Sequence, residues 1–305
     1  MKNKTIYLSW LGGITFLLIS GFVFNGERST ALKSYGNAST YKVYALNLPD
    51  TLSFADEKVP LNSPDLIERL DRELLVNTYW QSNMMLLIKR ANKYFPTIEK
   101  ILEEEGVPKD LKYLSVIESS LDNAISPAGA KGFWQIMKTT GREYGLEVNS
   151  NVDERYHLEL STRVAAKYLK KAKNKFGSWT LAAASYNRGM TGIQRNLNQQ
   201  KVDSYFDLRL GQETSRYVFR ILAVKEILEN PSKYGYVFEQ SDLYSSVPVR
   251  YHGLDTAISN LATFAQKMGV NYKILKIHNP WLLENHLNNN SRKHYEIAIP
   301  EKGYY

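Results

Sequence analysis

The chain of 305 residues contains no cysteine. This absence excludes disulfide bonds and acylation of a lipoprotein cysteine, so packing must stabilise the fold and any membrane attachment must come from another feature. Histidine is scarce as well, and the five histidines are scattered without the spacing of metal ligands. We therefore predict no metal site and no cofactor.

The N-terminus has the pattern of a membrane-directed segment. After the basic start at Lys2 and Lys4, residues 5–24 form an uncharged, mostly apolar run of about 20 residues, which is near the span length of a bilayer. We interpret residues 1–24 as a signal peptide or an uncleaved anchor, and favour the anchor because no Ala-x-Ala cleavage site follows promptly. The segment predicts an exported protein of the periplasm or cell envelope.

One carboxylate falls where a helix is expected to be buried. Apolar residues recur at helical spacing after Pro108, and Glu118 lies inside the same apolar arc rather than on the polar face. Burial disfavours the charged carboxylate and raises its pKa, which lets a glutamate hold and donate a proton near neutral pH. Glu118 is therefore a candidate general acid. The alternative is a glutamate that reaches water at the helix end or pairs with a Lys or Arg.

Three polar clusters follow Glu118. In the first, Trp134 supplies a stacking face and Gln135 an amide that can bond to a hydroxyl or acetamido group. The second is the pair Tyr186 and Asn187, where a helix of small residues ends at a glycine, and the third runs from Gln212 to Val218. The pair also has a plain interpretation as a helix C-terminus, and both readings can hold at once.

The clusters, in this order and spacing, resemble the lytic transglycosylase (SLT) domain of glycoside hydrolase family 23, which cleaves the glycan strands of peptidoglycan. The resemblance covers Leu111 to Leu228. It implies that Glu118 is the catalytic acid and base. It also implies a substrate-binding set: Ser126, Trp134, Gln135, Tyr186, Asn187, Glu213 and Tyr217.

The implied mechanism uses one carboxylate. Asp122 is the acidic residue closest to Glu118 in sequence, and we interpret it as a loop or capping residue. A single carboxylate suits assistance by the sugar's own acetamido group. The family's activity implies that Glu118 protonates the β-1,4 bond between N-acetylmuramic acid and N-acetylglucosamine. It then deprotonates the muramoyl 6-hydroxyl, which gives a 1,6-anhydromuramoyl end without consuming water.

The net charge of +8 fits a polyanionic partner. Peptidoglycan glycan strands and an anionic membrane surface both qualify. No segment resembles a nucleic-acid module, and the export signal argues against nucleic acid. Other cell-wall enzymes are candidate partners.

Helical patterns dominate, so we predict a mainly α fold with a lysozyme-like catalytic domain. Residues 25–62 are interpreted as a linker and extended segment, and 63–235 as the transglycosylase domain with its motif core at 111–228. Ser63 and Pro64 begin one helix, and Pro96 is expected to begin another that ends at Gly106. A lysine-rich helix is expected to be capped by Ser161 or Thr162.

The last segment, 247–302, has a β-α-α-β pattern. We expect strands at 247–251 and 295–300 and helices at 255–268 and 272–278. With Gly269-Val270 and Asn279-Pro280-Trp281-Leu282, this order resembles a LysM peptidoglycan-binding module. The alternative is a small packing domain that supports the enzyme.

Two other functions stay open at this point. A hydrolytic muramidase on the same scaffold would use water in place of the 6-hydroxyl and leave a reducing sugar end. A non-catalytic peptidoglycan-binding protein would be expected to lack Glu118 or the Tyr186-Asn187 pair, and both are present.

Overall fold

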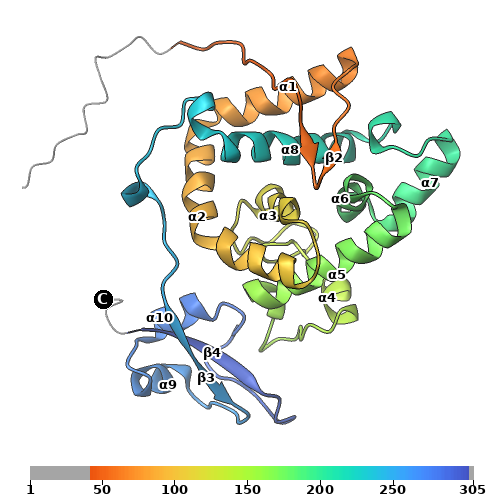
Figure 1. The fold of residues 1–305 in the computed structure, drawn as a ribbon. Helices are drawn as coiled ribbons and strands as arrows, with labels where there is room; N and C mark the ends of the chain where they lie inside the picture. The colour runs from red at the N-terminus through yellow and green to blue at the C-terminus, as the bar shows by residue number, and fades with distance from the viewer. Residues whose placement is uncertain (1–41, 302–305) are drawn as a thin grey trace, which may run out of the picture. The chain divides into compact units, whose positions relative to one another are not determined.

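The computed structural model describes residues 42–301, so the predicted signal or anchor segment at 1–24 lies outside the described residues. The elements below belong to the unit that begins at Ala45 (Figure 1). Among residues 42–301, no helix combines the length and the apolar content needed to cross a membrane. The prediction of a mainly α fold is confirmed.

A short hairpin opens the described chain. Strands β1 (Ser53–Phe54) and β2 (Glu57–Lys58) pair antiparallel. The two turn residues, Ala55 and Asp56, both have positive φ angles, of 51° and 63°, which matches the twist that two-residue hairpins require. The hairpin replaces part of the extended segment that the sequence predicts.

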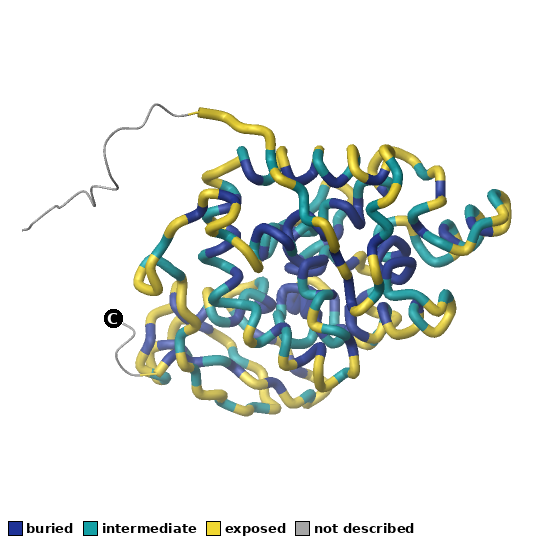
Figure 2. Tube along the Cα trace, turned by 45° about the horizontal axis from the view of Figure 1, so that its top comes forward, coloured by how far each residue is buried: buried dark blue, intermediate teal, exposed yellow. Residues whose placement is uncertain are grey.

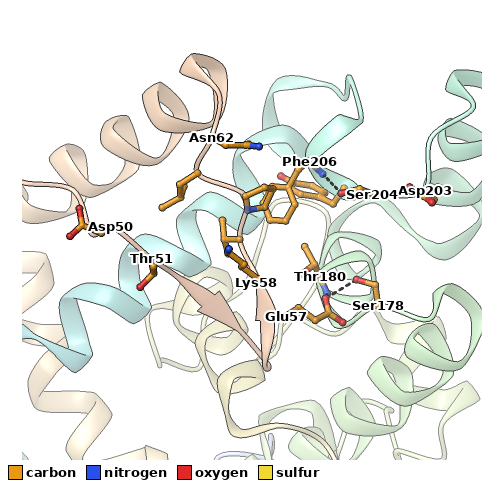
Figure 3. Close-up of a pocket in the computed structure, with 14 residues that line it drawn as sticks. Asp50, Thr51, Glu57, Lys58, Asn62, Ser178, Thr180, Asp203, Ser204 and Phe206 are labelled. Atoms are coloured by element: carbon orange, nitrogen blue, oxygen red, sulfur yellow. Dashed lines mark hydrogen bonds between the residues drawn. The ribbon is translucent and has the colours of Figure 1, made fainter.

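The Glu57 side chain joins this hairpin to the start of a helix far along the chain. Its carboxylate accepts hydrogen bonds from the backbone N–H groups of Trp179 (2.5 Å) and Thr180 (2.9 Å) and from the Ser178 hydroxyl (2.8 Å). The two N–H groups are among the unpaired backbone donors at the N-terminus of α6 (Trp179–Arg188), and Figure 3 shows Glu57 beside Ser178 and Thr180 there. Glu57 therefore caps α6 from another element.

Two long helices follow the hairpin. α1 (Pro64–Tyr79) begins as predicted, with the Ser63 hydroxyl accepting from the Leu66 N–H. α2 (Gln81–Glu104) runs through Pro96, so the predicted helix start at Pro96 is wrong. An interior proline costs about 3 kcal/mol. Buried side chains lie on both sides of it, from Met84 to Leu102, and their packing outweighs that cost.

The remaining helices of this domain are short to medium in length. They are α3 (Lys112–Ser119), α4 (Lys138–Glu143), α5 (Leu158–Phe176), α6, α7 (Met190–Gln200) and α8 (Gln212–Glu229). Single 3-10 turns occur at Lys109–Leu111, Glu154–Tyr156, Tyr205–Asp207, Pro231–Tyr234 and Gln240–Asp242. The predicted cap at Ser161 or Thr162 is wrong. α5 starts earlier, and both hydroxyls donate to the carbonyl of Leu158 inside the helix.

Helix α8 lies at the centre of the core. α8 packs against α1, α3 and α6, and α6 also packs against α5 and α7. The small residues Ala182, Ala183 and Ala184 are fully buried, which allows α6 to approach its neighbours closely. Figure 2 shows buried positions alternating with exposed ones along the surrounding helices. The helices that hold the predicted site residues are thus central to the packing.

The C-terminal module follows the predicted order. β3 (Val249–Leu254) pairs antiparallel with β4 (Tyr295–Pro300), and α9 (Leu261–Lys267) and α10 (Tyr272–His278) lie between them in the chain. The predicted bounds of α10 and β4 are confirmed. α9 is shorter than predicted because the Asn260 side chain caps it, accepting from the Thr263 N–H.

The buried apolar cluster of the module includes residues of the preceding domain. Val152 and Tyr156, from the preceding domain, belong to the same buried apolar cluster as Leu261, Leu282 and Ile297. Val152 also forms an antiparallel bridge with Leu282. The two parts are therefore packed together through a common apolar cluster.

Candidate active site

Glu118 lies in the last turn of α3, and the chain leaves the helix just after it. The Ser119 hydroxyl donates to the carbonyls of Ser115 and Phe133, at 3.0 and 2.8 Å. Ser120 and Leu121 then both adopt left-handed backbone, with φ of 57° and 55°. Two such residues in succession are uncommon outside glycine and occur where the surrounding structure holds them. The hydrogen bonds of Ser119 and the left-handed backbone after it therefore hold the helix end that carries Glu118 in one conformation.

The Glu118 carboxylate is partly buried and has a strong hydrogen-bond donor. The Tyr217 hydroxyl, on α8, donates to Glu118 Oε1 at 2.5 Å, and Tyr217 is buried. Burial raises the pKa of Glu118 above its ordinary value of 4.5, and the negative charge of Glu213 acts in the same direction. The Tyr217 hydrogen bond and the charge of Arg220 lower the pKa and offset only part of the rise. The balance favours a carboxyl that can carry a proton.

Tyr186 and Asn187 lie at the end of α6 and face two other parts of the site. The Tyr186 hydroxyl donates to the Trp134 carbonyl at 2.8 Å. Burial, together with the charge of Glu118, raises the pKa of Tyr186 well above its ordinary value, so its hydroxyl remains a donor. Asn187 donates to Glu213 at 2.9 Å and accepts from the Thr214 hydroxyl at 2.7 Å. The structure therefore brings Glu118, Tyr186, Asn187, Glu213 and Tyr217 into one region.

Ser126 and Gln135 stabilise the loop that follows Glu118. The Ser126 hydroxyl accepts from the Ala130 N–H at 3.0 Å, and Gln135 Nε2 donates to the carbonyls of Ala124 (3.0 Å) and Gly132 (2.9 Å). These hydrogen bonds go to the loop itself rather than to Glu118. Their predicted role in substrate binding stays a prediction.

The expectation that Trp134 offers a stacking face is not met. Its side chain has no exposed surface, and its indole N–H donates to the Thr162 hydroxyl at 2.8 Å. A ring can stack on a sugar only where one of its faces is open. Trp134 is a core residue here, and its contribution to the site is the backbone carbonyl that holds Tyr186.

Arg220 is not among the predicted site residues, and Thr214 lies in the Gln212–Val218 cluster without a predicted role. Arg220 donates to the Ile117 carbonyl at 3.1 Å and places a positive charge near Glu118. It lies three residues after Tyr217 on α8, so the i, i+3 spacing of the helix could have indicated it. Asp122 is exposed and pairs with Arg90 at 3.2 Å. Within residues 42–301, no cluster of three His, Asp or Glu side chains has the arrangement of a metal site.

Comparison with known proteins finds similarity along two stretches of the chain. Residues 96–207 match the transglycosylase SLT domain, and residues 250–303 match the LysM-like domain found at the C-terminus of soluble lytic transglycosylases. The first stretch is thus similar to SLT transglycosylase domains and the second to that LysM-like domain. The resemblance noted from the sequence is confirmed.

Individual relatives agree with this class. The chain is 30% identical over 300 residues to membrane-bound lytic murein transglycosylase D of Escherichia coli strain K12, which covers 92% of this chain and 64% of that protein. The protein of the same name from Escherichia coli O6:H1 gives the same values. The chain thus spans less than two thirds of the length of these relatives.

Two further comparisons are more distant. A putative tributyltin chloride resistance protein from Alteromonas sp. is 24% identical over 147 residues, which is 47% of this chain and 71% of that protein. Among solved structures, an inactive mutant of lytic transglycosylase Slt from Pseudomonas aeruginosa has 22% identity and a TM-score of 0.36. The aligned region covers 50% of this chain and 26% of the Pseudomonas chain.

Proposed function

We propose that this chain is a peptidoglycan lytic transglycosylase, a lyase that cuts the β-1,4 bond between N-acetylmuramic acid and N-acetylglucosamine. The names of the E. coli relatives state that those proteins are lytic murein transglycosylases. The observation that carries the proposal is the carboxyl of Glu118. It lies within the SLT domain, it has a raised pKa, and a buried tyrosine donates to it. Those are the requirements of a general acid.

In the proposed reaction Glu118 serves twice. Its proton passes to the glycosidic oxygen as the bond to the anomeric carbon breaks, and the sugar's own acetamido oxygen forms a bond to that carbon in place of the leaving sugar. The resulting carboxylate then takes the proton of the muramoyl 6-hydroxyl, whose oxygen bonds to the anomeric carbon and displaces the acetamido oxygen from it. The product ends in 1,6-anhydromuramic acid, and Glu118 recovers its proton. The donor Tyr217 stabilises the carboxylate that exists between the two steps.

The neighbouring groups are assigned to substrate positioning. Asn187 and Glu213, which are hydrogen-bonded to each other, and the Tyr186 hydroxyl would orient the acetamido group. Ser126 and Gln135 would present the loop 121–137 to the neighbouring sugar. Loss of any one of these groups is expected to slow the reaction without removing the acid.

Location and partners follow from the same assignment. We infer export to the periplasm or cell envelope, with residues 1–24 as a signal peptide or an anchor in the inner or outer membrane. Glycan strands are the substrate, residues 63–235 form the catalytic domain, and residues 247–302 form the LysM-like module. The net charge of +8 supports binding to the anionic wall.

The test is mass spectrometry of muropeptides released from purified sacculi by the protein lacking residues 1–24. Products lighter by one water than the hydrolytic ones are expected. Hydrated products would make the protein a muramidase. No products under conditions where a known transglycosylase cuts would favour a binding protein.

A further inference from the structure

The loop after Glu118 is held from outside by one buried arginine. Arg155 Nη1 donates to the carbonyls of Gly129 (3.0 Å) and Ile136 (3.1 Å), which lie on either side of the loop's tight turn. The same guanidinium donates to Asp153 through Nε (2.9 Å) and Nη2 (2.8 Å). Arg155 is 3% exposed and Asp153 is 1% exposed. The planar guanidinium has several N–H donors in a rigid arrangement, so it fixes the positions of several acceptors relative to one another.

The fit between loop and arginine is close. A Cβ atom on Gly132 would lie 2.0 Å from the Arg155 carbonyl oxygen, so only glycine lets the loop approach the backbone at this distance. The ammonium of Lys131 lies 3.4 Å from the Asp153 carboxylate and adds a third contact. The loop that carries Ser126 and Gln135 therefore depends on the segment around Asp153 and Arg155 for its position.

The segment around Asp153 and Arg155 is in turn hydrogen-bonded to the LysM-like domain. The Asp153 N–H donates to the Trp281 carbonyl, and the Leu283 N–H donates to the Asn151 carbonyl, both at 2.9 Å. The Asn151 side chain donates to the His286 carbonyl at 2.9 Å and accepts from the Asn288 N–H at 2.8 Å. The first two are backbone–backbone hydrogen bonds, as between the strands of a sheet, and the two bonds of the Asn151 side chain fix the same register.

Charged groups reinforce the same contact. Lys293 lies 2.9 Å from the Glu147 carboxylate and 2.5 Å from the Glu154 carboxylate, and the Tyr295 hydroxyl donates to Glu147 at 2.8 Å. Val152 adds apolar burial, since it has no exposed surface and belongs to the same apolar cluster as Leu261 and Leu282. A module that only tethers an enzyme to its substrate needs none of these contacts.

We propose that the LysM-like domain is a fixed part of the catalytic apparatus. By docking on residues 147–156 it sets, through Arg155, the position of the loop that carries Ser126 and Gln135 beside Glu118. Arg155 is thus a positioning residue, which acts on substrate groups through the loop. This inference rests on the proposed function, and it differs from a role of the module in wall binding.

The first experiment weakens the contact between the LysM-like domain and residues 147–156 without changing any residue of the loop 121–137. Lys293→Met in the chain lacking residues 1–24 removes the cation between Glu147 and Glu154, and Lys267→Met, an exposed lysine of α9, makes the same charge change away from the interface. Hydrogen exchange of the backbone amides of 121–137 is measured in both. We expect faster exchange of this loop in Lys293→Met alone, and equal exchange in the two variants would overturn the proposal.

The second experiment measures turnover of a soluble glycan fragment. Lys293→Met and Arg155→Lys are expected to lower kcat by about 10-fold to 100-fold with KM nearly unchanged, because misplacement of positioning groups by about 1 Å costs that much. Lys267→Met should match the parent. Loss of sacculus binding with an unchanged kcat would make the module a tether and contradict the inference.

The two readouts separate this inference from the proposed function. If the parent protein cuts no glycan, the proposed function fails and the exchange measurement still decides whether the module holds the loop. If the parent is active and neither variant changes exchange or kcat, the proposed function stands and the positioning role is wrong.

Discussion

The Tyr217 hydroxyl donates to Glu118 Oε1 at 2.5 Å, across 99 residues of sequence. This contact joins the end of α3 to α8 and gives the carboxylate its nearest partner. Because Tyr217 is buried and its pKa is raised well above the ordinary value, it stays a donor throughout the accessible pH range. The protonation state of Glu118 is therefore set mainly by burial against this hydrogen bond, with smaller contributions from the charges of Arg220 and Glu213.

Replacing the acid tests the assignment most directly. Glu118→Gln keeps the size of the side chain but cannot donate and recover a proton, so we expect cleavage of sacculi to fall by at least about 10²-fold to 10⁴-fold while the unfolding temperature changes little. Release of anhydromuropeptides is the measurement. Glu103→Gln, at an exposed position, is the control. Near-normal product release by Glu118→Gln would remove Glu118 from the mechanism.

Removing the donor should shift the pH profile in a known direction. The Tyr217 hydrogen bond lowers the pKa of Glu118, so Tyr217→Phe raises that pKa further. The protonated acid then persists to higher pH, and the alkaline limb of the pH profile of kcat/KM moves to higher pH. Tyr234→Phe removes a hydroxyl that binds Glu226 elsewhere in the domain and should leave the limb in place. A shift toward lower pH in Tyr217→Phe would contradict this account.

Glu57 should make stability depend on pH. Burial alone would raise its pKa, but hydrogen bonds from the Thr180 and Trp179 N–H groups and from Ser178 lower it below 4.5. Because the pKa of Glu57 is lower in the folded than in the unfolded state, the charged carboxylate stabilises the fold at pH values above the unfolded-state pKa. This stabilisation is lost as the pH falls through the folded-state pKa.

Urea unfolding of Glu57→Gln and the parent across pH 3 to 7 (about the range in which carboxylates titrate) is the measurement. The parent should be more stable near neutral pH, and the difference should shrink in acid. Glu68→Gln, at an exposed position of α1, should show no such trend. A gap that stays constant with pH would show that the charge of Glu57 does not cap α6.

Trp134 should affect stability rather than substrate affinity. Trp134→Phe removes buried ring atoms and the hydrogen bond to Thr162, so we expect a loss of about 1–3 kcal/mol in the free energy of unfolding. KM for soluble glycan should stay near the parent value. Thr162→Val, which removes only the partner, should be milder. A raised KM with unchanged stability would restore the stacking role.

Local patterns predicted the elements well where one signal dominated. The bounds of α10 and β4 agree with the sequence prediction, since each has clear apolar periodicity and flanking turn residues. Where a local sequence preference conflicted with the packing of distant residues, the packing decided the structure. Pro96 reads as a helix start in isolation, but it lies inside α2 because apolar residues on both sides pack into one core.

The sequence by itself determined the mainly α class, the motif order and the partly buried glutamate, because each depends on spacing along one helix or loop. Only the tertiary structure decided which distant groups meet. It buried Trp134, set Tyr217 against Glu118 and placed Glu57 at the start of α6. It also linked the LysM-like domain to the loop 121–137 through Asp153 and Arg155. Such pairings depend on how whole elements pack, and local periodicity carries no record of that packing.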